Sequence, residues 1–480
     1  MLKLLSELLP HQVIGTKWCL ENEEGGCILG DEMGLGKTVE AISVMVSNPL
    51  RTLVIVPATL IDQWAQEIAK HSSGFQVYIH RGRNRDTSVW ENYDIILSTY
   101  LIIANITNPI ETVDRVIIDE AHNLRNQSTK SFKRLRHVLE CIPYRILMTG
   151  TPICNGYKDL ISLFKMLNIE HVSTDKWWKQ FNDVESIEQL VPLRKEFMLY
   201  RQKKDCIGSE LPPIEYNEIR HSAKESQKEV YDAVFEADCK CVLQKITLLR
   251  LAADSGNLVD LASLTADDAD DAYGADAAES EGLQSNGGSD ARTDSGLNGE
   301  LCHKVGNLKK ILKRVPVGDK VIIFSAWTNM LVYLQQCIDP DGTMSVLRHG
   351  RLDPDAKADT LKKFQSEEAT RVLFCTLKSG GVGLNLTCAN HVILMEPHFN
   401  EAEEQQAIAR VYRFGQTKPV KVHRFGTTKS IDGWLNELKR TKLCIAKKVL
   451  EDAVETKVIE KCYKKTSDAL QKYVYGYAKA

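Results

Sequence analysis

The nine-residue stretch GDEMGLGKT (30–38) constrains the fold of this chain more than any other part of its sequence. It follows a short apolar run, Cys27–Leu29, and leads into TVEAISVMV, whose apolar residues recur at helical spacing. The pattern predicts a strand, a glycine-bearing loop and a helix whose positive N-terminal end faces a ligand. Such a turn is suited to phosphate, because its glycines let backbone N–H groups approach an anion closely.

Two residues of this loop carry its expected chemistry. Lys37 is expected to reach the outer phosphates of a nucleotide, and the Thr38 hydroxyl can ligate magnesium. The loop departs from the strict patterns GxxxxGKS and GxxxxGKT, because Asp31 stands where they have glycine. A glycine-rich turn that only happens to precede a lysine is the alternative. The residues expected to line a bound nucleotide are Asp31, Glu32, Met33, Gly34, Leu35, Gly36, Lys37 and Thr38.

Downstream of the loop, short β-rich runs alternate with helical patterns, which is typical of a parallel sheet covered on both faces. The runs are TLVIVP (52–57), YDIILSTY (93–100), RVIIDEAH (115–122) and YRILMTGTP (144–152). The residues of a functional site are expected at the carboxyl ends of these strands. There Asp119 can hold magnesium through water, while Glu120 positions and deprotonates an attacking water. A plain acidic turn after a strand is the alternative.

A second series of strands is predicted further along the chain, at KVIIFSAW (320–327), RVLFCT (371–376) and HVILME (391–396). Glycines 380, 381 and 383 follow the middle strand and permit another close backbone approach. The stretch EQQAIARVYRFGQ (404–416) places Gln406, Arg410 and Arg413 at i, i+4 and i+7, on one face of a predicted helix. Two arginines one turn apart could also be ordinary surface residues.

The formal charge of −3 is unevenly distributed along the 480 residues. The range 254–300 holds twelve acidic residues and one arginine, so the rest of the chain is mildly basic. A basic balance is compatible with binding to a phosphate backbone, although solvated lysines are its commoner cause. The acidic range is rich in small residues and is expected to be disordered, as a tether or as a negative shield that competes with nucleic acid.

The thirteen cysteines are scattered without the spacing of a zinc site, which predicts reduced thiols and no bound zinc. No apolar run approaches the roughly 18–20 residues that span a bilayer. The N-terminal MLKLLSELLP is too short for a signal peptide. These features predict an intracellular protein without a membrane segment.

The motifs QVIG (12–15), DEMGLGKT (31–38), DEAH (119–122) and LMTGTP (147–152) resemble, in this order and spacing, the first motor lobe of superfamily-two helicases. DEMGLGKT resembles in particular the Swi/Snf ATPases of chromatin remodelling and DNA repair, whose loop commonly has aspartate at this position. The motif LKSGGVGLNLT (377–387), followed by QAIARVYRFGQ (406–416), resembles most the branch of DNA-repair translocases with a RING finger between the lobes. That zinc module is missing here. A chain that consists almost entirely of the two motor lobes also resembles the global transactivator proteins of large insect DNA viruses.

The resemblance implies an α/β fold of two RecA-like parallel-sheet lobes with helical protrusions and a disordered acidic insert. The implied ranges are an ATP-binding lobe (1–167), a helical protrusion and hinge (168–253), the acidic insert (254–300), a second lobe (301–435) and a basic helical brace (436–480). Gln12 resembles an adenine-reading glutamine, and Gly383 resembles a nucleotide-site glycine of lobe two. The implied catalytic residues are Lys37, Glu120, Gln406 and the arginine fingers Arg410 and Arg413.

Contacts to a nucleic-acid backbone are implied at the strand ends of both lobes. The residues are Thr59, Thr99, Ser325, Thr376 and Lys378. One segment departs from the family pattern: MEPHFN (395–400) stands where relatives usually read DPWWNP, so Glu396 replaces an aspartate and the paired tryptophans are absent.

The function implied is a DNA-dependent ATPase that uses ATP and Mg²⁺ and translocates on double-stranded DNA. Its setting would be chromatin remodelling, transcription regulation or repair in the nucleus, or in a host nucleus if the protein is viral. Nucleosomes or DNA-bound factors are the implied cargo. An RNA-dependent helicase is the alternative within the class. An ATP-binding transcriptional scaffold without turnover is the alternative from another class.

Overall fold

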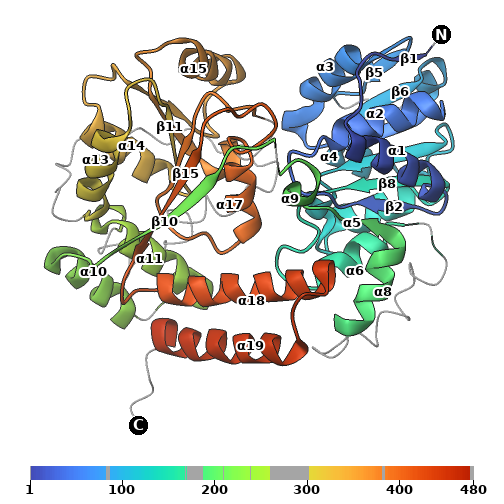
Figure 1. The fold of residues 1–480 in the computed structure, drawn as a ribbon. Helices are drawn as coiled ribbons and strands as arrows, with labels where there is room; N and C mark the ends of the chain where they lie inside the picture. The colour runs from blue at the N-terminus through green and yellow to red at the C-terminus, as the bar shows by residue number, and fades with distance from the viewer. Residues whose placement is uncertain are drawn as a thin grey trace.

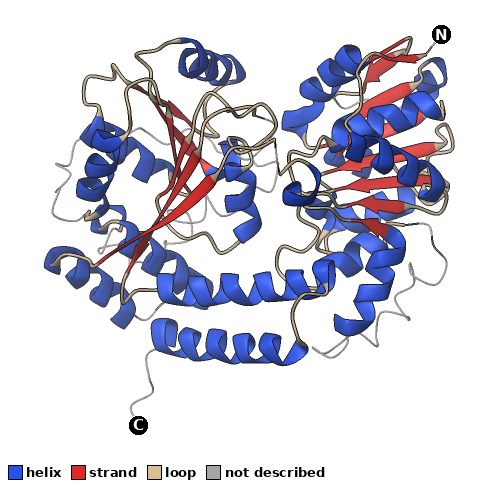
Figure 2. Ribbon diagram, viewed as in Figure 1, coloured by secondary structure: helices blue, strands red, loops and turns tan. Residues whose placement is uncertain are grey.

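The computed structural model describes residues 2–82, 87–167, 169, 187–208, 210–237, 239, 241–259, 302–380 and 384–475. These residues form two α/β lobes that lie side by side, each built on a parallel sheet with helices on both faces (Figures 1 and 2). The two-lobed parallel-sheet architecture predicted from the sequence is confirmed. The predicted insert lies mostly outside the described residues.

Lobe one is organised around a sheet with the strand order β5-β6-β3-β7-β8-β2-β9, in which neighbouring strands are parallel. The strands are β2 (Cys27–Leu29), β3 (Thr52–Val56), β5 (Val77–Ile79), β6 (Ile95–Thr99), β7 (Arg115–Asp119), β8 (Tyr144–Met148) and β9 (Met198–Leu199). A small antiparallel pair, β1 (Lys3–Leu4) and β4 (Ser72–Ser73), lies beside it. The helices are α1 (Pro10–Asn22), α2 (Lys37–Ser47), α3 (Ile61–His71), α4 (Tyr100–Ala104), α5 (Lys130–Val138), α6 (Lys158–Phe164), α8 (Ile187–Phe197) and α9 (Lys203–Cys206).

Successive residues of these strands enter different hydrophobic cores, which explains their continuous apolar character. On β3, Leu53 and Ile55 pack into one core, while Val54 and Val56 pack into the other with helices α2 and α3. Side chains alternate across a strand, so a sheet with both faces covered needs apolar residues at every position. Polar chemistry is thereby confined to the strand ends.

Lobe two repeats this plan with the parallel order β10-β15-β14-β11-β13-β12. Its strands are β10 (Ile214–His221), β11 (Val321–Ser325), β12 (Ser345–Arg348), β13 (Val372–Thr376), β14 (His391–Leu394) and β15 (Val420–Thr427). The helices of this half are α10 (Glu225–Glu236), α11 (Val242–Asp254), α13 (Lys304–Arg314), α14 (Thr328–Ile338), α15 (Pro354–Ser366), α16 (Leu377–Gly380), α17 (Glu401–Ile408), α18 (Asp432–Glu451) and α19 (Thr456–Leu470).

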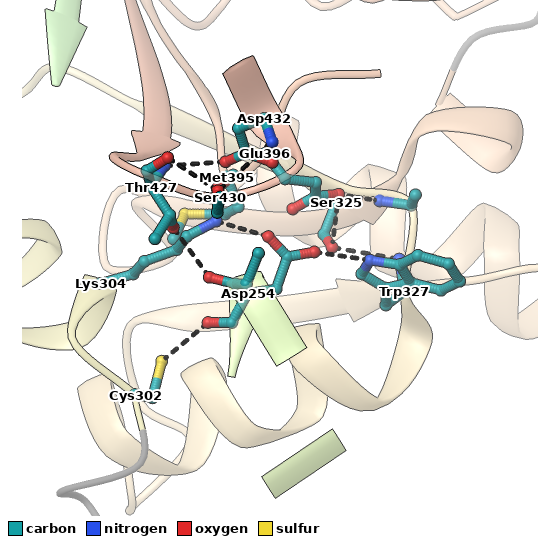
Figure 3. A network of polar contacts seen from close by, with 12 residues as sticks. Asp254, Cys302, Lys304, Ser325, Trp327, Met395, Glu396, Thr427, Ser430 and Asp432 are labelled. Atoms are coloured by element: carbon teal, nitrogen blue, oxygen red, sulfur yellow. Dashed lines mark hydrogen bonds and ion pairs between the residues drawn. The ribbon is translucent and has the colours of Figure 1, made fainter. Parts of the chain in front are cut away.

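Two of the expected domain ranges differ from the structure. The range 168–253, expected to be helical, contributes β9 to the sheet of lobe one and β10 to the sheet of lobe two. The acidic insert, expected to start at 254, begins later, because Asp254 is buried in lobe two. Its carboxylate lies 2.6 Å from the Lys304 ammonium and accepts a hydrogen bond of 2.7 Å from the Trp327 indole (Figure 3). Net charge identified the acidic range but did not indicate that Asp254 is buried.

Helix α18 runs from lobe two beneath lobe one, with α19 packed alongside it (Figure 1). Its residues Ile445 and Val449 belong to a hydrophobic core of lobe one. Lys442 donates to the Asn155 side chain at 3.0 Å in lobe one and to the Phe399 carbonyl at 2.8 Å in lobe two. The C-terminal helices therefore contact both lobes.

Among the described residues, no helix has the length and apolar character that a membrane span needs.

Candidate nucleotide site between the lobes

The phosphate loop connects β2 to the first turn of α2, and two of its glycines have the backbone conformation of a tight turn. Gly34 and Gly36 have φ angles of 93° and 91°, in the left-handed region that glycine adopts at little cost. A Cβ atom at position 36 would lie 2.3 Å from the amide nitrogen of Gln12, so a side chain there would displace the Gln12 amide. The Lys37 ammonium donates to the Asp31 carbonyl at 2.6 Å, at the base of the loop.

The carboxylate of Asp31 does not face the loop's interior. It is fully buried and accepts hydrogen bonds of 3.0 and 3.1 Å from the Arg201 guanidinium, which also lies 3.2 Å from Glu40. Burial and, after it, the neighbouring Asp31 carboxylate together raise the pKa of Glu40 to about 8, against the opposing effect of Arg201. Two buried carboxylates thus share one guanidinium, and Asp31 fastens the loop to the segment that follows β9.

Gln12 lies against the phosphate loop on helix α1. Its side-chain carbonyl accepts from the Leu9 N–H at 3.0 Å, which caps the helix, and its amide donates to the Leu35 carbonyl at 3.1 Å. The neighbouring His11 ring nitrogen lies 2.8 Å from the same carbonyl. Gln12 therefore supports the loop directly. Its recognition of adenine stays a prediction.

The two carboxylates of the DEAH motif are at the end of β7, next to the loop that follows β2. Asp119 accepts from the Trp64 indole N–H and from the Glu120 N–H, each at 2.8 Å. Burial raises the pKa of Asp119 to about 6, and the Glu120 charge adds to this effect. A cation beside Asp119 would favour its ionised form.

Glu120 has left-handed backbone angles, φ 51° and ψ 46°, which are uncommon for a residue other than glycine. Burial opposes its ionisation, but His122, Arg410 and Lys37 outweigh that effect and lower the pKa of Glu120 to about 2. The His122 ring lies 3.3 Å from Glu120 and 3.1 Å from the Thr149 hydroxyl. The carboxylate is therefore ionised and oriented.

The finger segment of lobe two, 409–416, faces this carboxylate. Gln406 on α17 donates to Glu120 at 3.3 Å, a hydrogen bond between the two lobes. Burial lowers the pKa of Arg410 to about 10, while Glu120 and Asp119 oppose that shift. The Cβ atom of Arg413 lies 3.4 Å from the position that a Cβ at Gly34 would take. Lobe two thus brings Gln406, Arg410 and Arg413 to the loop and the carboxylates of lobe one.

The expectation that these three residues share one helical face is wrong. Helix α17 ends at Ile408, so only Gln406 is helical, and both arginines lie in the turn that follows. The Arg410 carbonyl accepts from the Leu386 N–H at 3.0 Å, and the Val411 carbonyl accepts from the Gln416 amide at 3.2 Å. Because these partners satisfy the carbonyls, the helix need not continue.

The expected nucleic-acid contacts lie at the carboxyl edges of the two sheets. Thr59 is exposed after β3 and Thr99 is half-buried at the end of β6. Ser325 and Thr376 are paired across β11 and β13, and both are buried. The Ser325 hydroxyl donates to Glu396 at 2.9 Å (Figure 3), so this hydroxyl is already hydrogen-bonded within lobe two. Its contact with a nucleic-acid backbone stays a prediction. Gly383 and the side chain of Lys378 lie outside the described residues.

Thr38 and Asp119 fit a magnesium ion by their chemistry. Both offer oxygen ligands, which this hard cation prefers, and Asp119 is a half-buried carboxylate with a raised pKa. Thr38 lies in the first turn of α2. Within the described parts of the chain, no cluster of three or more histidine, cysteine, aspartate or glutamate side chains could hold a metal ion.

Several contributors to the site were not predicted as such. Trp64 donates to Asp119, and Arg201 donates to Asp31. Lys203 extends from α9 of lobe one and donates to the Tyr412 carbonyl of lobe two. The basic run RQKK (201–204) is the signal that could have identified the last two. Nothing in the sequence near Trp64 indicates its partner, because 55 residues separate them.

Comparison with known proteins identifies the family. A model described as the SNF2-related domain matches residues 11–266, more than half of the chain, and the helicase conserved C-terminal domain matches residues 303–415. The chain belongs to the Swi/Snf-type ATPases of helicase superfamily two. The resemblance inferred from the sequence motifs is confirmed, whereas the narrower likeness to RING-bearing repair translocases or viral transactivators stays a prediction.

Similar proteins include the chromodomain-helicase-DNA-binding protein 1-like of Danio rerio, 27% identical over 93% of this chain and 44% of the relative. The ATP-dependent helicase FUN30 of Saccharomyces cerevisiae is 26% identical over 98% of this chain and 48% of its own. The chain spans about half the length of these relatives. A solved SWI2/SNF2 ATPase core from Sulfolobus solfataricus in complex with dsDNA is 24% identical, with 98% of this chain and 97% of that chain covered and a TM-score of 0.43.

Proposed function

We propose that this protein is a double-stranded-DNA-stimulated ATPase that translocates on the duplex. It would use this movement to remodel protein–DNA complexes in a nucleus. The family membership supports ATP as the substrate. Two similar proteins are named as helicases, and the name of one of them also contains "DNA-binding". Duplex DNA as the track and DNA-bound proteins as the cargo are parts of the proposal.

The observation that carries the proposal is the hydrogen bond of 3.3 Å between Gln406 and Glu120. It joins the candidate base of lobe one to helix α17 of lobe two, which leads directly into the finger segment 409–416. Glu120 would orient the attacking water and accept its proton, and Lys37 would bind the outer phosphates. Arg410 and Arg413 would stabilise the charge that develops on the transferred phosphoryl group. Neither lobe then holds a complete site.

Thr38 and Asp119 are the residues that would hold Mg²⁺, which when bound supplies positive charge to the phosphate oxygens. Trp64 would keep Asp119 in place through its indole N–H. The raised pKa of Asp119 is consistent with a carboxylate whose ionised form needs a cation partner.

A DNA duplex that contacts the carboxyl edges of both sheets would favour closure of the lobes and so would promote hydrolysis. Such contacts are to phosphates, so binding should weaken steeply with salt and show little sequence preference. The exposed Thr59 and the strand ends at Thr99 and Thr376 are at these edges.

The test is steady-state ATP turnover with and without duplex DNA, in the wild-type protein and in Lys37→Ala. The proposal predicts faster turnover with DNA in the wild type and little turnover in Lys37→Ala. Equal wild-type rates with and without DNA would overturn it. Stimulation by RNA alone would indicate an RNA-dependent helicase. Retained biological activity in Glu120→Gln would indicate a scaffold without turnover.

A further inference from the structure

The segment that follows β9 is attached to the phosphate loop by several contacts. The Gly30 N–H donates to the Leu199 carbonyl at 2.8 Å, and the Glu32 N–H donates to the Arg201 carbonyl at 2.9 Å. The Lys203 N–H in turn donates to the Glu32 carboxylate at 2.8 Å. The loop and this segment therefore behave as one unit, with Lys203 at its end.

The side chain of Lys203 leaves this unit and enters the gap between the lobes. Its ammonium donates to the Tyr412 carbonyl at 2.9 Å and lies 3.7 Å from the Glu32 carboxylate. It also lies 5.4 Å from the centre of the Tyr412 ring, within reach of a cation–π interaction. Tyr412 lies between the two fingers, Arg410 and Arg413. Lys203 thus connects the phosphate loop to the finger segment.

This position is costly for a lysine. Its side chain is only 6% exposed, and a Cβ atom at Gly34 would lie 3.1 Å from its Cε atom. The pKa of Lys203 is lowered to about 8, mainly by burial; Glu32 opposes this shift, and the charges of Lys37 and Arg413 add to it. An ammonium that serves only solubility would instead be exposed, as the neighbouring Lys204 is.

We propose that Lys203 is a positioning residue that holds the finger segment 409–416 over the phosphate loop. It ties the main chain between the two fingers to the loop that binds the phosphates, and so sets where both arginines stand when the lobes close. This role rests on the proposed ATPase function. It differs from the roles of Lys37 and the fingers, because Lys203 acts through Tyr412 and Glu32.

The experiment compares the full-length wild type with Lys203→Met, Lys203→Arg and the matched control Lys204→Met. Two quantities are measured for each: kcat and KM for ATP with duplex DNA, and hydrogen exchange of peptides covering 409–416. Lys203→Met should lower kcat about 10²-fold, because small misplacements of catalytic groups cost about that much. Its KM should be unchanged, since the fingers act in the transition state. Lys203→Arg should recover part of the loss, and Lys204→Met should match the wild type.

Hydrogen exchange separates this inference from the proposed function. Exchange of 409–416 should be faster in Lys203→Met than in the wild type, while exchange of β11 and β14 stays the same, which excludes unfolding of lobe two as the cause. If the wild type is stimulated by DNA but Lys203→Met has the same kcat and exchange, the inference is wrong and the proposed function stands. If the wild type shows no stimulated turnover, the proposed function fails, and unchanged exchange in Lys203→Met would still refute the positioning role.

Discussion

Replacing Lys304 by methionine should destabilise lobe two more than any single surface change. The ammonium of Lys304 is fully buried, lies 2.6 Å from Asp254 and donates to the Met395 carbonyl at 2.5 Å (Figure 3). Two further carboxylates, Glu396 and Asp432, are buried close enough to raise the pKa of Lys304, which burial alone would lower. Lys304 is therefore a buried cation surrounded by three acidic side chains.

The size of the effect follows from what the substitution leaves behind. Methionine fills much of the lysine's volume, so the loss is mainly electrostatic. Removing one partner of a buried ion pair costs about 3–5 kcal/mol, because the other charge is left without a partner. The free energy of unfolding of a domain is only about 5–15 kcal/mol, so a large part of the stability of lobe two would be lost.

Hydrogen exchange of peptides from β11 and β14 is the suitable assay, because it reports on lobe two alone. Lys309→Met is the matched control, since Lys309 is an exposed lysine on the same helix, α13. The double variant Lys304→Met/Asp254→Asn should be less destabilised than the sum of its single variants, by about 0.5–3 kcal/mol. A loss below about 1 kcal/mol in Lys304→Met would refute the view that this ion pair is buried and required.

Three further predictions concern single hydrogen bonds and charges. Burial and the nearby Asp254 raise the pKa of Glu396 to about 8. Between about pH 5 and pH 8 the native state therefore keeps a proton that the unfolded state loses, so the free energy of unfolding falls as the pH rises. Thermal unfolding of Glu396→Gln should lack that decline. Trp64→Phe removes the indole donor to Asp119 and should lower magnesium affinity or turnover about 10- to 100-fold, as a magnesium titration of ATP turnover would reveal. Thr129→Ala removes the cap that accepts from the Phe132 N–H at 3.2 Å, and it should cost helix α5 about 1 kcal/mol by hydrogen exchange.

The strands and the phosphate loop could be predicted from the sequence because their signals are local. Continuous apolar runs indicate strands covered on both faces, and each predicted run contains a strand of the structure, such as β3 within 52–57 and β14 within 391–396. The carboxyl-end position of Asp119 and Glu120 follows from the same pattern. These features depend on neighbours in the chain, which a sequence displays directly.

The remaining features depend on partners that are distant in the chain. Helix α17 ends at Ile408, and the carbonyls that follow it accept hydrogen bonds from Leu386 and the Gln416 side chain, so helical spacing alone suggested the wrong geometry for the two arginines. The position of Asp31 in the loop indicated the Swi/Snf branch of the superfamily. Its partner Arg201 could not be predicted, because it lies 170 residues away in the chain. Lys203 could be noticed as part of a basic run, whereas its contact with Tyr412 required the folded structure.

The central claim is that the nucleotide site is complete only when lobe two contributes its fingers. ATP turnover of Arg410→Ala at saturating ATP and duplex DNA tests this claim most directly. Removing an arginine finger should reduce turnover about 10³- to 10⁵-fold, while nucleotide binding to the intact phosphate loop is retained. Turnover of Arg410→Ala at the wild-type rate would contradict the claim, because lobe one alone would then be the ATPase.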